Sequence, residues 1–171
     1  MTRAERTVVT IRRATAEDLE AVADVYLASR RAAYPAIPPS VHADEDVRTW
    51  MAGRIEAATQ LFVAEGVGGR VVAMMVLDGN WLDQLYVDPA HAGSGVGSQL
   101  LEFAKMVRPA GLQLWTFESN TGARRFYERH GFVPAERTDG SRNEERAPDI
   151  RYVWPPRHAG AGRTRRSLDD R

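Results

Sequence analysis

The spacing of hydrophobic positions at the start of the chain predicts a strand followed by a helix. Residues 7–13 are rich in β-branched side chains, which favour a strand. Thr15 and Asp18 have the spacing of a capping box, and the apolar side chains of residues 19–27 fall on one helical face. This first helix should end before Pro35, because a run of prolines follows.

A second helix is expected from near Ser40, since the apolar side chains of residues 47–55 recur at helical spacing. Three short apolar segments follow, at residues 61–65, 71–77 and 81–87. Short glycine-rich and Asp-Gly turns separate them, and such turns join antiparallel strands.

The second half of the chain is expected to alternate between helices and strands. The pattern predicts a helix that stops at Pro109, a strand at 112–117, a helix at 121–130, and strands at 132–137 and 150–154. A strand, helix, strand order favours parallel pairing. We therefore expect an α/β fold of order β-α-α-β-β-β-α-β-α-β-β, with a mixed sheet that changes from antiparallel to parallel pairing. Ligands favour such a switch point.

Length and composition indicate one domain. A chain of 171 residues with 43% hydrophobic content can bury one core, which we expect to span residues 1–156. Residues 157–171 are rich in Gly and Arg and should form a disordered tail. An alternative makes these arginines a nucleic-acid arm, although such an end is more often solvated.

Charge and residue usage exclude several kinds of partner and chemistry. Lys plus Arg and Asp plus Glu both total 23, so no overall field favours nucleic acid or a membrane surface. The absence of cysteine excludes disulfides and a cysteine nucleophile, and the four histidines have no ligand spacing, so no metal is assigned. No apolar run follows Met1 or reaches membrane-spanning length, which favours a cytoplasmic location.

A glycine-rich turn, residues 91–97, lies between a predicted strand and a predicted helix. Its backbone N–H groups can approach a phosphate at the positive end of the helix. A nucleotide triphosphatase loop is excluded, because the only lysine is Lys105, within the next helix. A dinucleotide fold is a minor alternative: Glu118 has the position of a ribose-binding acid, but Ser98 replaces the third glycine.

Residues 81–132 contain a strand that ends in Val87-Asp88-Pro89, then the glycine turn, and later a segment from Asn120 to Phe132. In these features they resemble the GNAT superfamily of acetyl-CoA-dependent N-acetyltransferases. In that family, a strand ending in Val-Asp-Pro leads to an Arg/Gln-x-x-Gly-x-Gly/Ala turn, and an Asn-x-x-Ala-x-x-Phe-Tyr-x-x-x-Gly-Phe segment follows later. This chain has matching segments at residues 83–89, 92–97 and 120–132. The first position of the turn is Ala92 here, so a side-chain contribution to pyrophosphate binding is missing.

The resemblance implies an enzyme that moves an acetyl group from acetyl-CoA to a primary amine in a ternary complex. Tyr127 would protonate the departing thiol, Asn120 would contact the pantetheine arm, and backbone N–H groups of residues 85–87 would hold the oxyanion. The implied cofactor-binding residues are Leu85, Tyr86, Val87, Gly93, Ser94, Gly95, Val96, Gly97, Ser98, Asn120, Ala123, Phe126 and Tyr127.

The general base and the acceptor stay open at the level of sequence. Asp83, Glu118, Glu144 and Glu145 are candidate bases, and the last two belong to a long polar loop that could receive a cationic amine. Polyamine, amino acid, aminoglycoside and peptide acceptors all remain open.

Three aromatic residues could wall the acceptor pocket: Tyr34, Trp50 and Trp81. A non-catalytic acyl-CoA-binding or regulatory domain is the rival interpretation, because Ala92 departs from the motif and no base is evident. A homodimer is compatible with the resemblance.

Overall fold

The chain folds around one mixed sheet in a computed structural model that describes residues 7–57 and 60–155. The strand order is β1-β2-β3-β4-β5-β7-β6. The strands are β1 (Thr10–Arg13), β2 (Gln60–Glu65), β3 (Val71–Asp78), β4 (Trp81–Val87), β5 (Leu112–Phe117), β6 (Val133–Thr138) and β7 (Asp149–Trp154). The α-helices are α1 (Leu19–Ala32), α2 (Asp44–Glu56), α3 (Val96–Val107) and α4 (Thr121–Arg129). The predicted mixed α/β fold and its element order are thereby confirmed.

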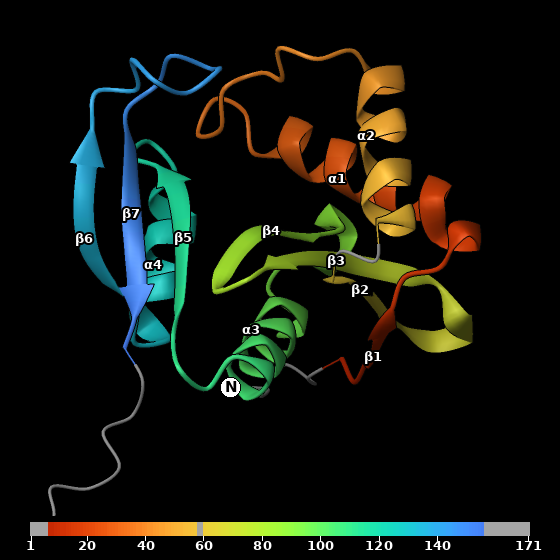
Figure 1. Cartoon of the computed structure of the whole chain (residues 1–171). Helices are drawn as coiled ribbons and strands as arrows, with labels where there is room; N and C mark the ends of the chain where they lie inside the picture. Colours follow the sequence, from red (N-terminus) through yellow and green to blue (C-terminus); the bar gives the residue numbers. More distant parts are fainter. Residues whose placement is uncertain (1–6, 58–59, 156–171) are drawn as a thin grey trace, which may run out of the picture.

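The pairing changes at β4, where the sheet opens. Strands β1 to β4 pair antiparallel, whereas β4 and β5 pair parallel at a single position, Trp81 with Gln113. In the β3–β4 ladder, Asp83 is an extra residue between two consecutive pairs, which makes it a β-bulge. Because a bulge bends its strand and increases the local twist, β4 turns away from β5 beyond this point. Figure 1 shows the β5–β7–β6 portion set apart from β1–β4.

Two hydrophobic clusters lie on the two faces of the sheet. Met74 and Val76 belong to the cluster that includes side chains of α1 and α2, whereas Met75 and Leu77 belong to the one that includes α3 and α4. Successive side chains of a strand point to opposite faces. Coverage of both faces therefore explains why β3 is a continuous apolar run rather than an alternating one.

The predicted boundaries differ from the observed ones mainly in the first half of the chain. The first strand begins at Thr10 rather than at residue 7, and the second helix begins at Asp44 rather than near Ser40. Asp44, Glu45 and Asp46 occupy the first turn of α2, where acidic side chains interact favourably with the helix dipole. The expected end of the domain at residue 156 and the tail at 157–171 lie outside the described residues.

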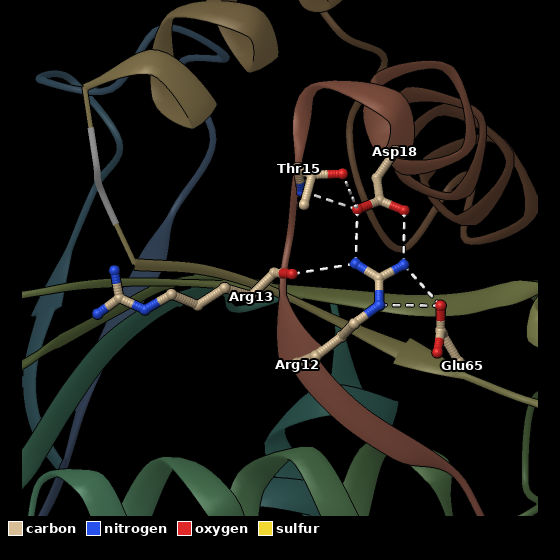
Figure 2. Close-up of polar contacts among 5 residues, drawn as sticks. All are labelled: Arg12, Arg13, Thr15, Asp18 and Glu65. Atoms are coloured by element: carbon tan, nitrogen blue, oxygen red, sulfur yellow. Dashed lines mark hydrogen bonds and ion pairs between the residues drawn. The ribbon is translucent and has the colours of Figure 1, made fainter.

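An ion-pair network joins β1, the start of α1 and β2 (Figure 2). Arg12 donates to both carboxylate oxygens of Asp18, at 2.7 and 2.9 Å, and to Glu65 Oε1 at 2.6 and 2.9 Å. The backbone N–H and the hydroxyl of Thr15 also donate to Asp18 Oδ2. Asp18 is only 7% exposed, and its hydrogen bonds with Arg12 lower its pKa to about 2. Asp18, the acidic residue of the predicted capping box, thus also belongs to the ion-pair network of Arg12.

Candidate active site

A cavity of about 530 Å³ lies where β4 and β5 diverge. Among its lining residues are five that the sequence assigned to the cofactor or to catalysis: Leu85, Tyr86, Asn120, Ala123 and Tyr127. Other lining residues come from α1, β5, β6, β7 and the loop between β6 and β7. Strand β4 is paired with β3 along its length, and its remaining backbone N–H and C=O groups point toward β5. Beyond Trp81, these groups are not paired with β5.

The glycine turn leads directly into α3. Gly93 and Gly95 have φ angles of 75° and 87°, in the left-handed region that favours glycine. The first hydrogen bond of the helix runs from the Gln99 N–H to the Gly95 carbonyl, at 3.1 Å. The N–H groups of residues 96–98 precede this bond and are therefore free to bind an anion at the positive end of α3.

Several site residues contribute through packing as well as through the backbone. A Cβ atom on Gly97 would lie 3.5 Å from Val87 and 3.6 Å from Phe126, so glycine allows α3 to approach β4 and α4 closely. Val96 is buried in the core, and Ser94 donates its hydroxyl to the His91 carbonyl. These side chains stabilise the shape of the turn. A ligand would therefore contact the backbone N–H groups of the turn and not these side chains.

The first turn of α3 is also linked to α4 through a histidine. His130 Nδ1 donates to the Phe126 carbonyl at 2.7 Å, and its Nε2 is 3.1 Å from Ser98 Oγ. Gly95, Ser98 and His130 line a second hollow of about 510 Å³ beside α3. The glycine turn does not line the larger cavity.

Tyr127 combines a packed ring with an available hydroxyl. The residue is 8% exposed, and its ring packs against Phe126, Phe132 and Tyr152. Its hydroxyl makes no hydrogen bond to another described residue, and Tyr127 is one of the residues that line the cavity. Burial raises the pKa of Tyr127 well above its usual range, so the hydroxyl keeps its proton at neutral pH.

Asn120 caps α4 and lines the same cavity. Its Oδ1 accepts a hydrogen bond from the Ala123 N–H at 3.1 Å, the arrangement typical of a helix N-cap. The side-chain nitrogen Nδ2 of Asn120 makes no hydrogen bond with another described residue, and so it can donate to a ligand.

The cavity brings together only two of the four candidate bases. Asp83 lies at the bulge, 3.4 Å from Arg54, and burial raises its pKa. Glu145 also lines the cavity and is paired with Arg30 at 3.0 Å. Glu118 and Glu144 do not line it: Glu118 is an exposed partner of Arg137, and Glu144 an exposed partner of His42.

The aromatic wall differs from the one expected. Tyr34, Trp50 and Trp81 do not line the cavity, and Trp50 packs against Tyr26 with Arg54 over its ring. Trp115 on β5 lines the cavity instead. Asn143 and Asp149 of the predicted polar loop also line the cavity, whereas nothing in the sequence indicated Arg30, Glu136 or Thr138 as lining residues.

No histidine or acidic cluster with the geometry of a metal site occurs in residues 7–57 and 60–155. Within the same ranges, every helix is too short or too polar to cross a membrane.

The opened sheet, the glycine turn before α3 and the tyrosine on α4 define the class of protein. The family model described as "Acetyltransferase (GNAT) domain" matches residues 57–134, which contain β4, the glycine turn and α4. It also covers the opening between β4 and β5, so the matched region contains most of the candidate site.

Named relatives are also acetyltransferases. YwnH of Bacillus subtilis (strain 168), provisionally named a phosphinothricin acetyltransferase, is 31% identical over 141 residues, which is 73% of this chain and 84% of YwnH. The peptidyl-lysine N-acetyltransferase YjaB of Salmonella typhimurium (strain LT2) is 33% identical over 56% of this chain and 65% of its own length. The chain therefore belongs to the GNAT family and is an N-acetyltransferase.

Solved structures agree with this assignment. The solution structure of the apo form of YjaB from Escherichia coli has a TM-score of 0.68 at 26% identity, and covers 87% of this chain and 99% of its own. The crystal structure of PaiA N-acetyltransferase from Thermoplasma acidophilum in complex with coenzyme A has a TM-score of 0.62 at 19% identity, covering 86% and 99%. The second similarity concerns the fold alone.

Proposed function

We propose that the enzyme transfers an acetyl group from acetyl-CoA to a primary amine of a small molecule or peptide, by direct attack in a ternary complex. One observation carries the proposal. The unpaired edge of β4, the Tyr127 hydroxyl and acidic side chains from elsewhere in the chain all border one cavity. A donor thioester and an acceptor amine can meet there, and the chain has no cysteine to carry a thioester intermediate.

The donor would lie along β4, with its acyl end in the cavity and its pyrophosphate on the first turn of α3. The free N–H groups of residues 96–98 fit a phosphate without a side chain at position 92. Backbone N–H groups of residues 85–87 that face the opening would stabilise the tetrahedral oxyanion, because they are fixed by the β3–β4 ladder before the reaction begins.

Tyr127 would assist the departure of the thiolate. Its raised pKa makes complete proton transfer to a thiolate unfavourable, since a simple thiol has a pKa of about 8.5. The same shift keeps the hydroxyl protonated, so that it can donate a hydrogen bond as negative charge develops on sulfur.

The attacking amine must lose a proton, and Asp83 suits that task better than Glu145. A free amine with a pKa of about 10.4 is mostly protonated at neutral pH. Asp83 is a partly desolvated carboxylate whose pKa is raised although Arg54 lies 3.4 Å away, which makes it a stronger base, whereas Glu145 is held more closely by Arg30, at 3.0 Å. Asp83 would accept the proton directly or through water.

Thermal unfolding with acetyl-CoA, CoA or NAD added separately tests the donor assignment. A ligand present at 100 times its Kd stabilises the folded state by about 2.7 kcal/mol, so a rise in the midpoint with both CoA compounds and none with NAD is expected. Stabilisation by NAD alone would refute the donor assignment.

Thiol release then tests the acceptor, with n-butylamine, spermidine, L-lysine, L-glutamate and a lysine-containing peptide as probes. We expect turnover with at least one of these amines. Stabilisation by acetyl-CoA without turnover of any of them would instead favour the non-catalytic acyl-CoA-binding alternative.

A further inference from the structure

Arg30 lines the side of the cavity formed by the β6–β7 loop, which we call the acceptor side because the donor is proposed to lie along β4. It lies in the last turn of α1, and its Nη2 donates to Glu145 Oε1 at 3.0 Å and to the Pro38 carbonyl at 3.2 Å. Glu145 belongs to the loop between β6 and β7 and is 115 residues away in sequence. One side chain therefore links α1, the α1–α2 connection and the β6–β7 loop, which approach one another at one end of the molecule (Figure 1).

The Arg30–Glu145 ion pair is the most enclosed one in the described part of the chain. Its side chains are 11% and 16% exposed, whereas every other ion pair there has a partner at least 36% exposed. Exposed pairs contribute little, but removal of one partner from an enclosed pair leaves an uncompensated charge. Both partners of this pair also line the cavity.

Arg30 is also linked to β4, through the ring of Tyr26. Its guanidinium carbon lies 5.7 Å from the centre of the Tyr26 ring, and Tyr26 packs edge-on against Tyr86 of β4 at 4.9 Å. Tyr86 lines the cavity, and burial raises its pKa to about 12, so it stays neutral. The guanidinium thus lies between β4 and the β6–β7 loop, the two sides of the cavity.

The fold does not satisfy all the hydrogen-bonding groups of Arg30. Its Nε is buried and has no hydrogen-bond partner among the described residues. An unsatisfied buried donor reduces stability, and such groups are rare in folded proteins. A role in stability alone therefore explains this arginine poorly.

We propose that Arg30 is a positioning residue for acceptor binding, which holds the β6–β7 loop across the acceptor side of the cavity through Glu145. This inference rests on the proposed transfer to an amine. Arg30 acts on the loop and not on the reacting atoms, so its loss should weaken acceptor binding and leave acetyl-CoA binding unchanged.

Hydrogen exchange tests the positioning role without any acceptor. In Arg30→Met and in Glu145→Gln, amide exchange in residues 139–147 should become at least about tenfold faster, because the loop loses its anchor. The matched control is Asp44→Asn, which removes the exposed ion pair of Asp44 with Arg31, the residue after Arg30. It should leave amide exchange in the loop unchanged. Unchanged loop exchange in both test variants would overturn the proposal.

Steady-state kinetics with the fastest amine of the probe panel tests the effect on binding. The KM for the amine should rise by about tenfold in each single variant, with kcat and the KM for acetyl-CoA within about twofold of wild type. The double variant should match the single ones, because both act through one contact. Equal loss in kcat and in both KM values would indicate a general structural defect and contradict the proposal.

The hydrogen-exchange and kinetic experiments together distinguish the failure of this inference from the failure of the proposed function. Absence of turnover by the wild-type enzyme with every amine would refute the acceptor assignment, and loop exchange would still decide whether Arg30 positions the loop.

Discussion

Tyr127 lines the cavity while its ring packs in the core, so substitution can remove the hydroxyl and keep the packing. We expect Tyr127→Phe to lower kcat by about 100-fold, because a hydrogen-bond donor to the departing sulfur is lost. The Kd for acetyl-CoA, measured by calorimetry, should change little. Tyr152→Phe is the control, since that hydroxyl donates to Glu128. Equal kcat values in wild type and Tyr127→Phe would refute the role of Tyr127 as a hydrogen-bond donor to the departing sulfur.

Asp83 differs from the other acids of the cavity because burial raises its pKa and Arg54 only partly offsets that. If it accepts the proton of the amine, Asp83→Asn should lower kcat/KM at pH 7 by at least about tenfold. The deficit should shrink as the pH approaches the amine pKa of about 10.4, where the free amine needs no base. A pH profile checks this, with the exposed Asp46→Asn as control, because Asp46 does not contribute to the raised pKa of Asp83. A deficit that is constant with pH would argue against the role of base.

At the scale of elements, the Arg12 network ties β1 and β2 to the start of α1. The pKa of Asp18 is depressed, so its contribution to stability is present above the unfolded pKa of about 3.9 and is lost as the pH falls toward 2. Asp18→Asn should lower the free energy of unfolding at pH 7 by about 2 kcal/mol, and the difference should vanish near pH 2. Urea unfolding at several pH values measures this, with exposed Glu17→Gln as control. A constant difference between pH 7 and pH 2 would contradict the assignment.

The connection from β4 to α3 depends on glycine at position 95. Because φ at Gly95 is 87°, Gly95→Val strains the turn, and its side chain would also crowd a bound pyrophosphate. Acetyl-CoA affinity should fall by more than about tenfold. Gly68→Val is a matched control: φ there is 74°, and a Cβ would meet nothing within 4 Å. It should show strain without loss of affinity. Undiminished affinity in Gly95→Val would mean that the pyrophosphate binds elsewhere.

Features encoded within a few residues were predictable from sequence, whereas those that depend on distant contacts were not. The glycine turn and the Asn120-to-Tyr127 spacing each lie within a short stretch of chain, and the helices and strands follow local periodicity. The bulge at Asp83 has no glycine or proline to indicate it, and the position of Arg30 depends on Glu145, far along the chain. Trp50 has the spacing of a core residue, but it is 37% exposed and packs against Tyr26 outside the core.

At the scale of the whole molecule, strands β4 and β5 are joined at one ladder position, so a ligand between them would contact both parts of the sheet. We expect acetyl-CoA to slow amide exchange in residues 82–87 of β4, residues 112–117 of β5 and the first turn of α3. Residues 60–65 of β2 lie two strands away from the opening and should be unaffected, which makes them an internal control. Uniform protection of all strands, or protection confined to the hollow beside α3, would place the ligand elsewhere.

The bulge at Asp83 also has a consequence for protein handling. The bulge leaves the edge of β4 beyond Trp81 unpaired in the middle of the sheet, where no neighbouring strand covers it. Unpaired edges are the places where extended chains add to one another. A bound donor that occupies this edge would act as a temporary extra strand, so the enzyme should resist aggregation best when it is purified and stored with CoA.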